Sequence, residues 1–143
     1  MAQYPWESSY PPGVKWELEV PKKTLHQIFE ESCAQYGDRP FTDFLDKVMS
    51  FREYKEASDR AAAGFQKLGV KPGVNVGLYL PNTPHYIIAF FGVLKAGGKV
   101  VNYSPLDAAR ELEFKIGDSE TDILVTLDVA ALYPTMAAMR GKT

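Results

Sequence analysis

Residues 74–103 read VNVGLYLPNTPHYIIAFFGVLKAGGKVVNY, and this stretch decides the fold. Its first part, Val74 to Leu80, is a short run of β-forming residues and predicts a strand. Pro84 favours the first turn of a helix over residues 84–96, and because that helix is apolar nearly all round, we expect protein to cover most of its sides. Lys99 to Tyr103 predicts a second strand. Short connections between strand, helix and strand predict parallel pairing with a right-handed crossover.

The same alternation continues toward the C-terminus. A helix from about Ala108 to Ile116, with Asp107 as its cap, precedes a strand from Asp122 to Leu127. The last segment, Asp128 to Arg140, has apolar residues at helical spacing, although Pro134 would interrupt a helix begun before it. Strands that alternate with helices in this way predict an α/β fold with a parallel βαβαβ core.

Two capping boxes mark helix starts before this core. Thr24-Leu-His-Gln27 predicts the start of a leading helix over about residues 25–36. Ser50-Phe-Arg-Glu53 has the same spacing and predicts the start of a second helix, which ends at Gly69. In each box the hydroxyl and the amide or carboxylate three residues later satisfy backbone N–H groups that a helix start otherwise leaves unpaired.

The other N-terminal features divide the chain. Phe41 to Leu45 and Val48 to Ser50 predict a short β-hairpin. Residues 1–23 are rich in proline and have neither helical nor strand period, so we predict an extended lead-in whose aromatic side chains lie on the domain surface. Those side chains are Tyr4, Trp6, Tyr10 and Trp16. Residues 24–143 are predicted to form a single α/β unit.

Composition excludes several classes of protein. The chain has 18 acidic and 16 basic residues and no Lys or Arg run beyond Lys22-Lys23, so it lacks the basic field of a nucleic-acid-binding protein. Cys33 is the only cysteine, which excludes an intrachain disulfide and a cysteine-cluster zinc site. The first residues lack the features of a secretory signal, so we expect a cytoplasmic location. The longest apolar stretch, Tyr86 to Leu94, is too short to span a bilayer and leaves peripheral membrane association open.

Common nucleotide-binding and catalytic motifs are absent from the sequence. No G-x-G-x-x-G follows a strand, and G-x-S-x-G does not occur. The segment Gly92 to Lys99 comes nearest to a phosphate loop, but it ends a helix where a phosphate loop begins one, so Gly97-Gly98 is interpreted as a helix C-cap. The two histidines cannot form a metal site alone; we expect His26 on the surface and a polar contact for His85. We therefore assign no catalytic, cofactor-binding or metal-binding residue.

Polar residues follow the predicted strands at the carboxyl ends, where open α/β sheets bind ligands. They are Pro81, Asn82 and Thr83 after the first strand, Tyr103 and Ser104 after the second, and Asp128 after the third. Each junction also needs a cap or a turn. We favour these structural roles: a helix cap for Asn82 or Thr83, a turn for Ser104 before a proline, and a cap for Asp128.

Two segments carry a family resemblance. Ser50-Phe51-Arg52-Glu53-Tyr54 resembles the first core motif of the acyl-adenylate-forming enzymes. Leu94 to Pro105 resembles the second, in which a buried helix ends at Lys-Ala-Gly and a strand runs to a proline. The ending Asn102 to Leu106, followed by Arg110-Glu-Leu-Glu113, is more similar to acyl-CoA ligases than to peptide-synthetase adenylation domains. The likeness covers about residues 24–128 and, within the family, points to the bacterial long-chain fatty-acid–CoA ligases.

This resemblance implies a two-step reaction of the parent enzyme. A fatty acid and Mg-ATP give an acyl-adenylate and pyrophosphate, and the thiol of CoA then displaces AMP. Fatty acid, ATP, magnesium and CoA are thus the implied substrates and cofactors. The family's phosphate loop, adenine- and ribose-binding motifs, magnesium-binding glutamate and C-terminal lysine lie downstream of the matched region, and none of these motifs occurs here. We expect the 143 residues to be an incomplete part of the larger N-terminal domain, inactive alone and with none of these molecules bound.

An incomplete domain leaves apolar surface and strand edges uncovered, so we expect the chain to self-associate. In this interpretation Phe90 and Phe91 lie at the enclosed centre of the apolar helix. Two other classes stay open: a self-contained flavodoxin-like binding or signalling module, and an interaction domain that uses the lead-in or a sheet edge. No pair of aspartates follows an early strand, which counts against a receiver-like signalling module.

Overall fold

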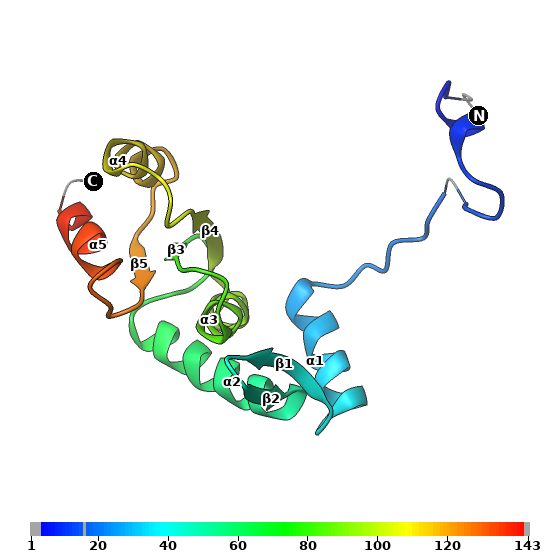
Figure 1. Cartoon of the computed structure of the whole chain (residues 1–143), viewed down its shortest axis with the longest axis horizontal. Coiled ribbons are helices and arrows are strands. Elements are labelled where there is room, and N and C mark those ends of the chain that lie inside the picture. The colour runs from blue at the N-terminus through cyan, green and yellow to red at the C-terminus, as the bar shows by residue number, and fades with distance from the viewer. Residues whose placement is uncertain (1–3, 16, 142–143) are drawn as a thin grey trace.

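The computed structural model describes residues 4–15 and 17–141, and its architecture confirms the predicted α/β class. Figure 1 shows a parallel sheet with helices beside it, next to a leading helix, a hairpin and a long second helix. In chain order the elements are a 3-10 helix Glu7–Ser9, α1 Leu25–Tyr36, β1 Pro40–Phe44, β2 Lys47–Ser50, α2 Phe51–Lys67, β3 Asn75–Tyr79, α3 Pro84–Lys95, β4 Lys99–Tyr103, α4 Ala109–Asp118, β5 Ile123–Thr126 and α5 Tyr133–Met139. Trp16 of the predicted lead-in lies outside the described residues.

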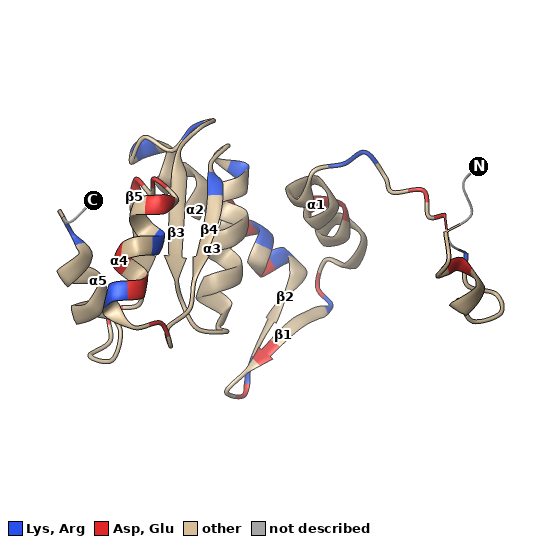
Figure 2. Ribbon diagram, turned by 90° about the horizontal axis from the view of Figure 1, so that it is seen from above, with Lys and Arg blue, Asp and Glu red and all other residues tan. Residues whose placement is uncertain are grey.

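The central strand of the parallel sheet is β3. The strand order is β4-β3-β5, and Val76 of β3 pairs with Val100 on one side and with Ile123 on the other. The chain leaves β3 through α3 toward one edge and leaves β4 through α4 toward the opposite edge. Right-handed crossovers therefore place these two helices on opposite faces. Figure 2 shows α2 and α3 on one side of the strands and α4 and α5 on the other.

Alternate residues of β3 supply the cores on these two faces, as the strand period requires. Val76 and Leu78 belong to the cluster formed with α2 and α3, whereas Tyr79 belongs to the cluster formed with α4 and α5. Gly77 faces the second cluster, and the ring of Tyr103 occupies the space where a side chain at Gly77 would stand. The sheet is therefore covered on both faces, which is what a parallel sheet needs.

Both predicted capping boxes form and set the starts of α1 and α2. The Thr24 hydroxyl accepts a hydrogen bond from the Gln27 N–H at 3.4 Å, and the Ser50 hydroxyl accepts one from the Glu53 N–H at 3.3 Å. The predicted hairpin is also confirmed as the antiparallel pair β1–β2. Its turn lies at Leu45 and Asp46, both of which have positive φ.

The caps predicted at Asp107 and Asp128 are wrong. The N-cap of α4 is Ala108, without a side-chain hydrogen bond, because Asp107 is engaged in the preceding turn and by Lys115. Asp128 is exposed in a loop and caps no helix, because α5 begins only at Tyr133. Pro134 then lies in the first turn of α5, where its ring and its missing N–H are tolerated.

Helix α3 is less enclosed than its sequence suggests. Ala89, Gly92 and Val93 are buried, but Phe90 and Phe91 are only partly buried, so the expectation that both are fully enclosed is wrong. The buried stripe consists of small residues because α2 approaches closely; a Cβ on Gly92 would lie 2.7 Å from the Cβ of Ala61. The larger side chains diverge to the flanks of this contact. None of the helices in the described ranges is long and apolar enough to cross a membrane.

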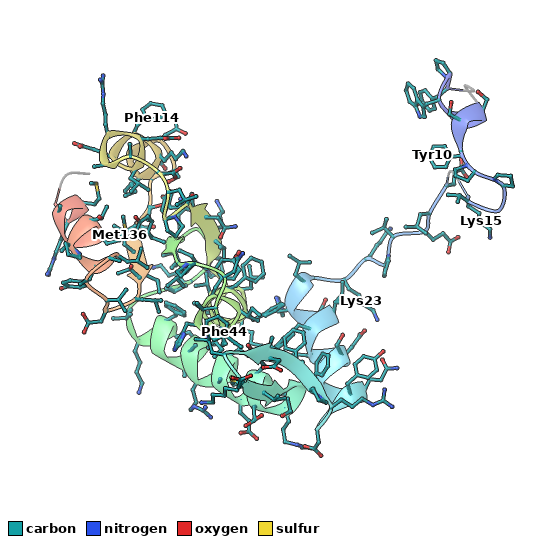
Figure 3. The ribbon with its side chains drawn as sticks, viewed as in Figure 1. Tyr10, Lys15, Lys23, Phe44, Phe114 and Met136 are labelled. Atoms are coloured by element: carbon teal, nitrogen blue, oxygen red, sulfur yellow. The ribbon has the colours of Figure 1, made fainter. Side chains whose placement is uncertain are left out.

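The lead-in departs from the prediction as well. Residues 4–15 and 17–23 run away from the α/β body, and Figure 3 shows Tyr10 and Lys15 far from it. The ring of Tyr4 stacks on Trp6 with centroids 4.7 Å apart. The expected packing of these aromatic side chains on the domain surface is therefore not found. The predicted division into a lead-in and one α/β unit stays a prediction.

Candidate functional site

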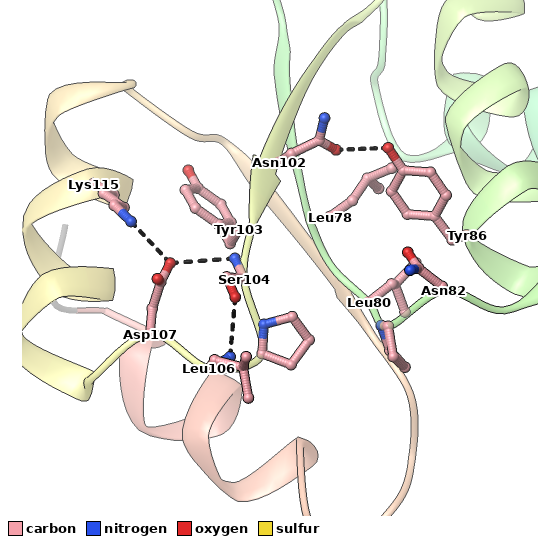
Figure 4. A pocket seen from close by; sticks show the side chains of 12 residues that line it. Leu78, Leu80, Asn82, Tyr86, Asn102, Tyr103, Ser104, Leu106, Asp107 and Lys115 are labelled. Carbon is pink, nitrogen blue, oxygen red and sulfur yellow. Dashed lines mark hydrogen bonds and ion pairs between the residues drawn. The ribbon is translucent and has the colours of Figure 1, made fainter.

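A pocket of about 650 Å³ opens at the carboxyl ends of β3 and β4. It brings together four of the strand-end residues singled out from the sequence, namely Pro81, Asn82, Tyr103 and Ser104. Figure 4 shows these side chains with others that the sequence did not single out as ligand contacts. The additional lining residues are Leu78, Leu80, Tyr86, Asn102, Pro105, Leu106, Asp107 and Lys115.

The strand order explains why the pocket lies there. Because α3 and α4 leave the sheet toward opposite edges and on opposite faces, the loops after β3 and β4 separate above the sheet. Open α/β sheets bind ligands in the crevice at such a switch point. The fold alone thus identifies this pocket as the candidate site.

One wall of the pocket is the turn from Ser104 to Asp107. The Ser104 hydroxyl accepts a hydrogen bond from the Leu106 N–H at 3.1 Å, which confirms the predicted turn. The Asp107 carboxylate accepts from the Ser104 N–H at 3.2 Å and from the Lys115 ammonium at 3.0 Å. Asp107 was predicted to cap α4, and it instead closes the turn and fixes Lys115 at the pocket, as the dashed lines in Figure 4 show.

The opposite wall comes from α3. The Tyr86 hydroxyl donates to the side-chain oxygen of Asn102 at 3.1 Å and so links α3 to β4 across the pocket. Between the two walls, Leu78 and Leu80 form the apolar floor of the pocket. Asn82 is exposed at the rim, and within the described ranges its amide has no hydrogen-bond partner. A ligand in the pocket would therefore meet the Asn82 amide and the edge of the Tyr86 ring above this apolar floor.

The electrostatics of the pocket favour uncharged groups. Among its lining residues only Asp107 and Lys115 are charged. Lys115 lies 2.7 Å from Glu111 and 3.0 Å from Asp107, and hydrogen bonds to Glu111 and then to Asp107 raise the pKa of its ammonium. Because two carboxylates already compensate the single cation, the pocket presents no spare positive charge to a phosphate group.

Tyr103 has an architectural role in this site. Its ring is 4% exposed, and its hydroxyl hydrogen-bonds the hydroxyls of Ser119 and Thr121. These bonds tie the end of β4 to the turn between α4 and β5. The hydroxyl is therefore occupied within the fold and is not available to a ligand.

A second, more apolar pocket of about 390 Å³ lies between β1 and the start of α3 and shares Asn82 and Tyr86 with the first. Thr83 lines it and stands at the N-cap of α3, but its hydroxyl makes no capping bond and is buried without a partner. Of the two residues predicted as a cap, Asn82 and Thr83, Thr83 therefore occupies the N-cap position, but its side chain makes no capping bond. His85 is exposed, and among the described residues its side chain makes no polar contact, contrary to the prediction.

The other candidates fall outside both pockets. His26 lies on α1 with its Nε2 3.2 Å from the Thr24 hydroxyl, and in the described part of the chain no three His, Cys, Asp or Glu side chains stand together as a metal site would require. Gly97 and Gly98 form the predicted C-cap: Gly97 has a φ of 90°, and the Gly98 N–H donates to the Val93 carbonyl at 3.0 Å. Their amides thus satisfy the helix end and do not converge on an anion.

Comparison with known proteins identifies the family. The protein-family model of the AMP-binding enzymes matches residues 29–142 of the sequence, so the chain belongs to that family. Its fold matches the N-terminal domain of adenylate-forming enzymes, so the resemblance stated from the sequence is confirmed and a flavodoxin-like module is set aside.

Particular relatives can be named within that family. A long-chain-fatty-acid–CoA ligase of Bacillus subtilis is 35% identical over 139 residues, which are 97% of this chain and 24% of that protein. A crystal structure of a long-chain-fatty-acid–CoA ligase from Archaeoglobus fulgidus superposes with a TM-score of 0.77 at 25% identity, over 88% of this chain and 27% of that one. The N-terminal domain of a Mycobacterium tuberculosis protein, FACL13, gives 0.74 at 22% identity, over 81% and 29%. The chain thus spans about a quarter of the length of the relatives it matches.

Proposed function

We propose that the chain supplies the N-terminal portion of an ATP-dependent fatty-acid–CoA ligase. In the proposed reaction the fatty-acid carboxylate attacks the α-phosphorus of ATP, forming an acyl-adenylate and releasing pyrophosphate. The CoA thiol then attacks the acyl carbon, forming the thioester and releasing AMP. The adenylate step converts a poor leaving group into a good one.

One observation carries this proposal. The match to the Bacillus subtilis ligase spans 97% of the chain at 35% identity, so the matched segment contains the loops around the pocket as well as the core. Core residues alone would support only the fold, because a fold hosts many functions. An overall identity of 35% over a span that contains the strand-end loops, where ligands bind in such sheets, supports the function.

Within that enzyme the chain would contribute architecture and one wall of a substrate site. The pocket at the ends of β3 and β4 holds no uncompensated cation, so it suits an uncharged part of a substrate and not a triphosphate. Stabilising the charge that develops on a phosphate needs preorganised donors, which these residues do not provide. We therefore assign the phosphate chemistry to segments outside the present 143 residues.

No residue of this chain is assigned to magnesium. A magnesium ion bound with a nucleotide is held by one or two carboxylates together with phosphate oxygens and waters. In the ranges that the structure describes, no group of three or more His, Cys, Asp or Glu side chains could hold a metal ion. When bound elsewhere in the enzyme, magnesium would neutralise the phosphates of ATP, and no step of our account places it on this chain.

We propose that the chain is cytoplasmic, with membrane contact at most peripheral. We also propose that it self-associates. Partly buried apolar side chains on the flanks of α3 support this, as does the uncharged strand β5, whose second edge pairs with no described strand.

The direct test uses two proteins. One is the 143-residue chain alone, and the other is a chimera in which the 139 residues matched in the comparison replace the corresponding segment of the Bacillus subtilis ligase. ATP binding is measured by isothermal titration calorimetry. We expect no binding by the chain alone and binding by the chimera. The unmodified Bacillus enzyme is the control.

The results separate the alternatives. ATP binding or fatty-acid-dependent pyrophosphate release by the chain alone would contradict the proposal that segments outside these 143 residues carry the phosphate chemistry. A chimera that melts cooperatively yet does not bind ATP would contradict the proposed function itself, because its ATP-binding segments come intact from an active ligase. Release of pyrophosphate with amino acids but not with fatty acids would favour a peptide-synthetase type of enzyme.

A further inference from the structure

Helix α1 is attached to the body differently at its two ends. At its C-terminal end the Gly37 carbonyl accepts a hydrogen bond from the Arg52 N–H at 2.9 Å, so this end is fixed to the start of α2. Gly37 itself has a φ of 48° and a ψ of −106°, a backbone conformation that glycine permits. At its other end α1 continues into the lead-in, which runs away from the body in Figure 1. Along α1 only Phe29 and Cys33 are buried.

Lys95, at the C-terminal end of α3, contacts both neighbouring helices. Its side chain is 7% exposed, and its ammonium donates to Asp59 at 2.6 Å and to Ser58 at 3.0 Å, both on α2. Toward α1 the same ammonium lies 3.4 Å from the Glu30 carboxylate and 5.3 Å from the centroid of the Phe29 ring. One nearly buried cation therefore bridges three helices.

We propose that α1 is a detachable arm with its hinge at Gly37, and that the contact of Lys95 with Glu30 and Phe29, called the latch below, holds it closed. Phe29 and Cys33 also form a buried cluster with Tyr54 of α2, and the ring of Phe29 stacks on Phe91 of α3 with centroids 3.9 Å apart. These apolar contacts open together with the latch. The element that moves is α1 with the lead-in, and the rest of the fold stays in place.

The charges around Lys95 explain why the open state is accessible. Removing every partner from a buried cation is strongly unfavourable. When α1 leaves, however, Asp59 and Ser58 on α2 still accept from Lys95. The Glu30 side chain is already 45% exposed, so water and salt compete for it in the closed state. Opening thus breaks the weakest of the contacts that Lys95 makes.

The only cysteine of the chain reports on the position of α1. Cys33 is 4% exposed in the closed arm, and burial raises the pKa of its thiol, although Lys95 and Lys55 oppose that effect. A thiol reagent reaches Cys33 when α1 lifts, so the labelling rate measures the population of the open arm. Local openings of this kind occur at a lower free energy than global unfolding.

The experiment measures the rate at which Cys33 reacts with an aromatic disulfide reagent in the intact chain at low and high salt. Glu30→Gln removes the charge that the latch uses. Glu31→Gln is the matched control, because Glu31 pairs at 2.7 Å with Lys23 of the lead-in and not with Lys95. We expect Glu30→Gln to label about 1.5-fold to fivefold faster, the factor that one partly exposed ion pair contributes to an equilibrium. Glu31→Gln should label at the wild-type rate.

The salt dependence of labelling and the labelling rate of Lys95→Met complete the test. High salt should accelerate labelling of the wild type and have less effect on Glu30→Gln, which no longer has an ion pair to screen. Lys95→Met should label at least as fast as Glu30→Gln, and thermal melts show that each variant is folded. Equal rates for Glu30→Gln and Glu31→Gln would overturn the latch. Wild-type labelling with the denaturant dependence of global unfolding would overturn the detachable arm.

Discussion

The replacement of Gly77 by alanine tests the packing beneath the candidate site. A Cβ at this position would lie 2.3 Å from the Cε2 atom of the Tyr103 ring and 3.0 Å from methyl groups of Leu124 and Thr121. The closest contact is about 1.2 Å short of an ordinary carbon–carbon distance of about 3.5 Å. Tyr103 cannot easily retreat, because its hydroxyl is held by Ser119 and Thr121.

The magnitude follows from these two constraints. Overpacking a core by one methyl group costs about 1 to 3 kcal/mol, and giving up a hydrogen bond of Tyr103 adds about 1 kcal/mol. We therefore expect Gly77→Ala to lower the free energy of unfolding by about 2 to 4 kcal/mol, measured by urea denaturation. In Gly64→Ala the new Cβ meets nothing within 4 Å on an exposed part of α2. That control should be stabilised by up to about 1 kcal/mol through helix propensity.

A double variant separates the clash from other effects. If the Tyr103 ring is the obstacle, Gly77→Ala combined with Tyr103→Leu should be more stable than the sum of the two single effects predicts, by about 1 kcal/mol or more. A loss below about 0.5 kcal/mol for Gly77→Ala, or simple additivity of the two substitutions, would refute the reasoning.

Three other predictions follow from the same structure. Thr83→Val replaces a buried hydroxyl that lacks a partner by a methyl group of similar shape. Urea denaturation should therefore show an unchanged free energy of unfolding or a gain of up to about 1 kcal/mol. The control Thr24→Val removes a hydroxyl that does cap a helix, and it should lower the free energy of unfolding by about 1 kcal/mol. Burial raises the pKa of Asp59, but hydrogen bonds from Lys55 and Lys95 outweigh it and leave that pKa lowered. Its contribution to stability should therefore be complete above the unfolded pKa of about 3.9 and disappear as the pH falls through the lower folded value, and a loss that begins near neutral pH would contradict this assignment. Static light scattering over a concentration series should show species larger than 16.0 kDa, and a strictly monomeric chain at every concentration would remove the case for self-association.

Local signals in the sequence predict the elements of this fold well because each signal acts within a few residues. The capping boxes at Thr24 and Ser50 and the C-cap at Gly97 are satisfied by atoms three to five positions away, so their outcome does not depend on the tertiary arrangement. The parallel core follows from the same local elements through the handedness of the crossovers.

Features that depend on packing between elements were predicted less well. The partial exposure of Phe90 is set by how closely α2 approaches the small residues of α3, and no local pattern encodes that distance. Asp107 and Lys115 were missed as a pair at the pocket because the turn after β4 brings a loop residue onto α4. The spacing Ser104-Pro-Leu-Asp107, in which an aspartate can bond an N–H three residues earlier, was the available signal. The position of the pocket itself was predictable, since it follows from strand order.

If this chain serves as the N-terminal portion of a fatty-acid–CoA ligase, the chimera that carries its 139 matched residues in place of the corresponding Bacillus subtilis segment should form acyl-CoA. The most direct measurement detects acyl-CoA by mass spectrometry after the chimera is incubated with a long-chain fatty acid, ATP and CoA. We predict acyl-CoA at a kcat/KM within about tenfold of the unmodified enzyme, a loss of transition-state stabilisation of about 1.4 kcal/mol at most. A folded chimera that binds ATP but forms no acyl-CoA from any fatty acid would contradict the claim.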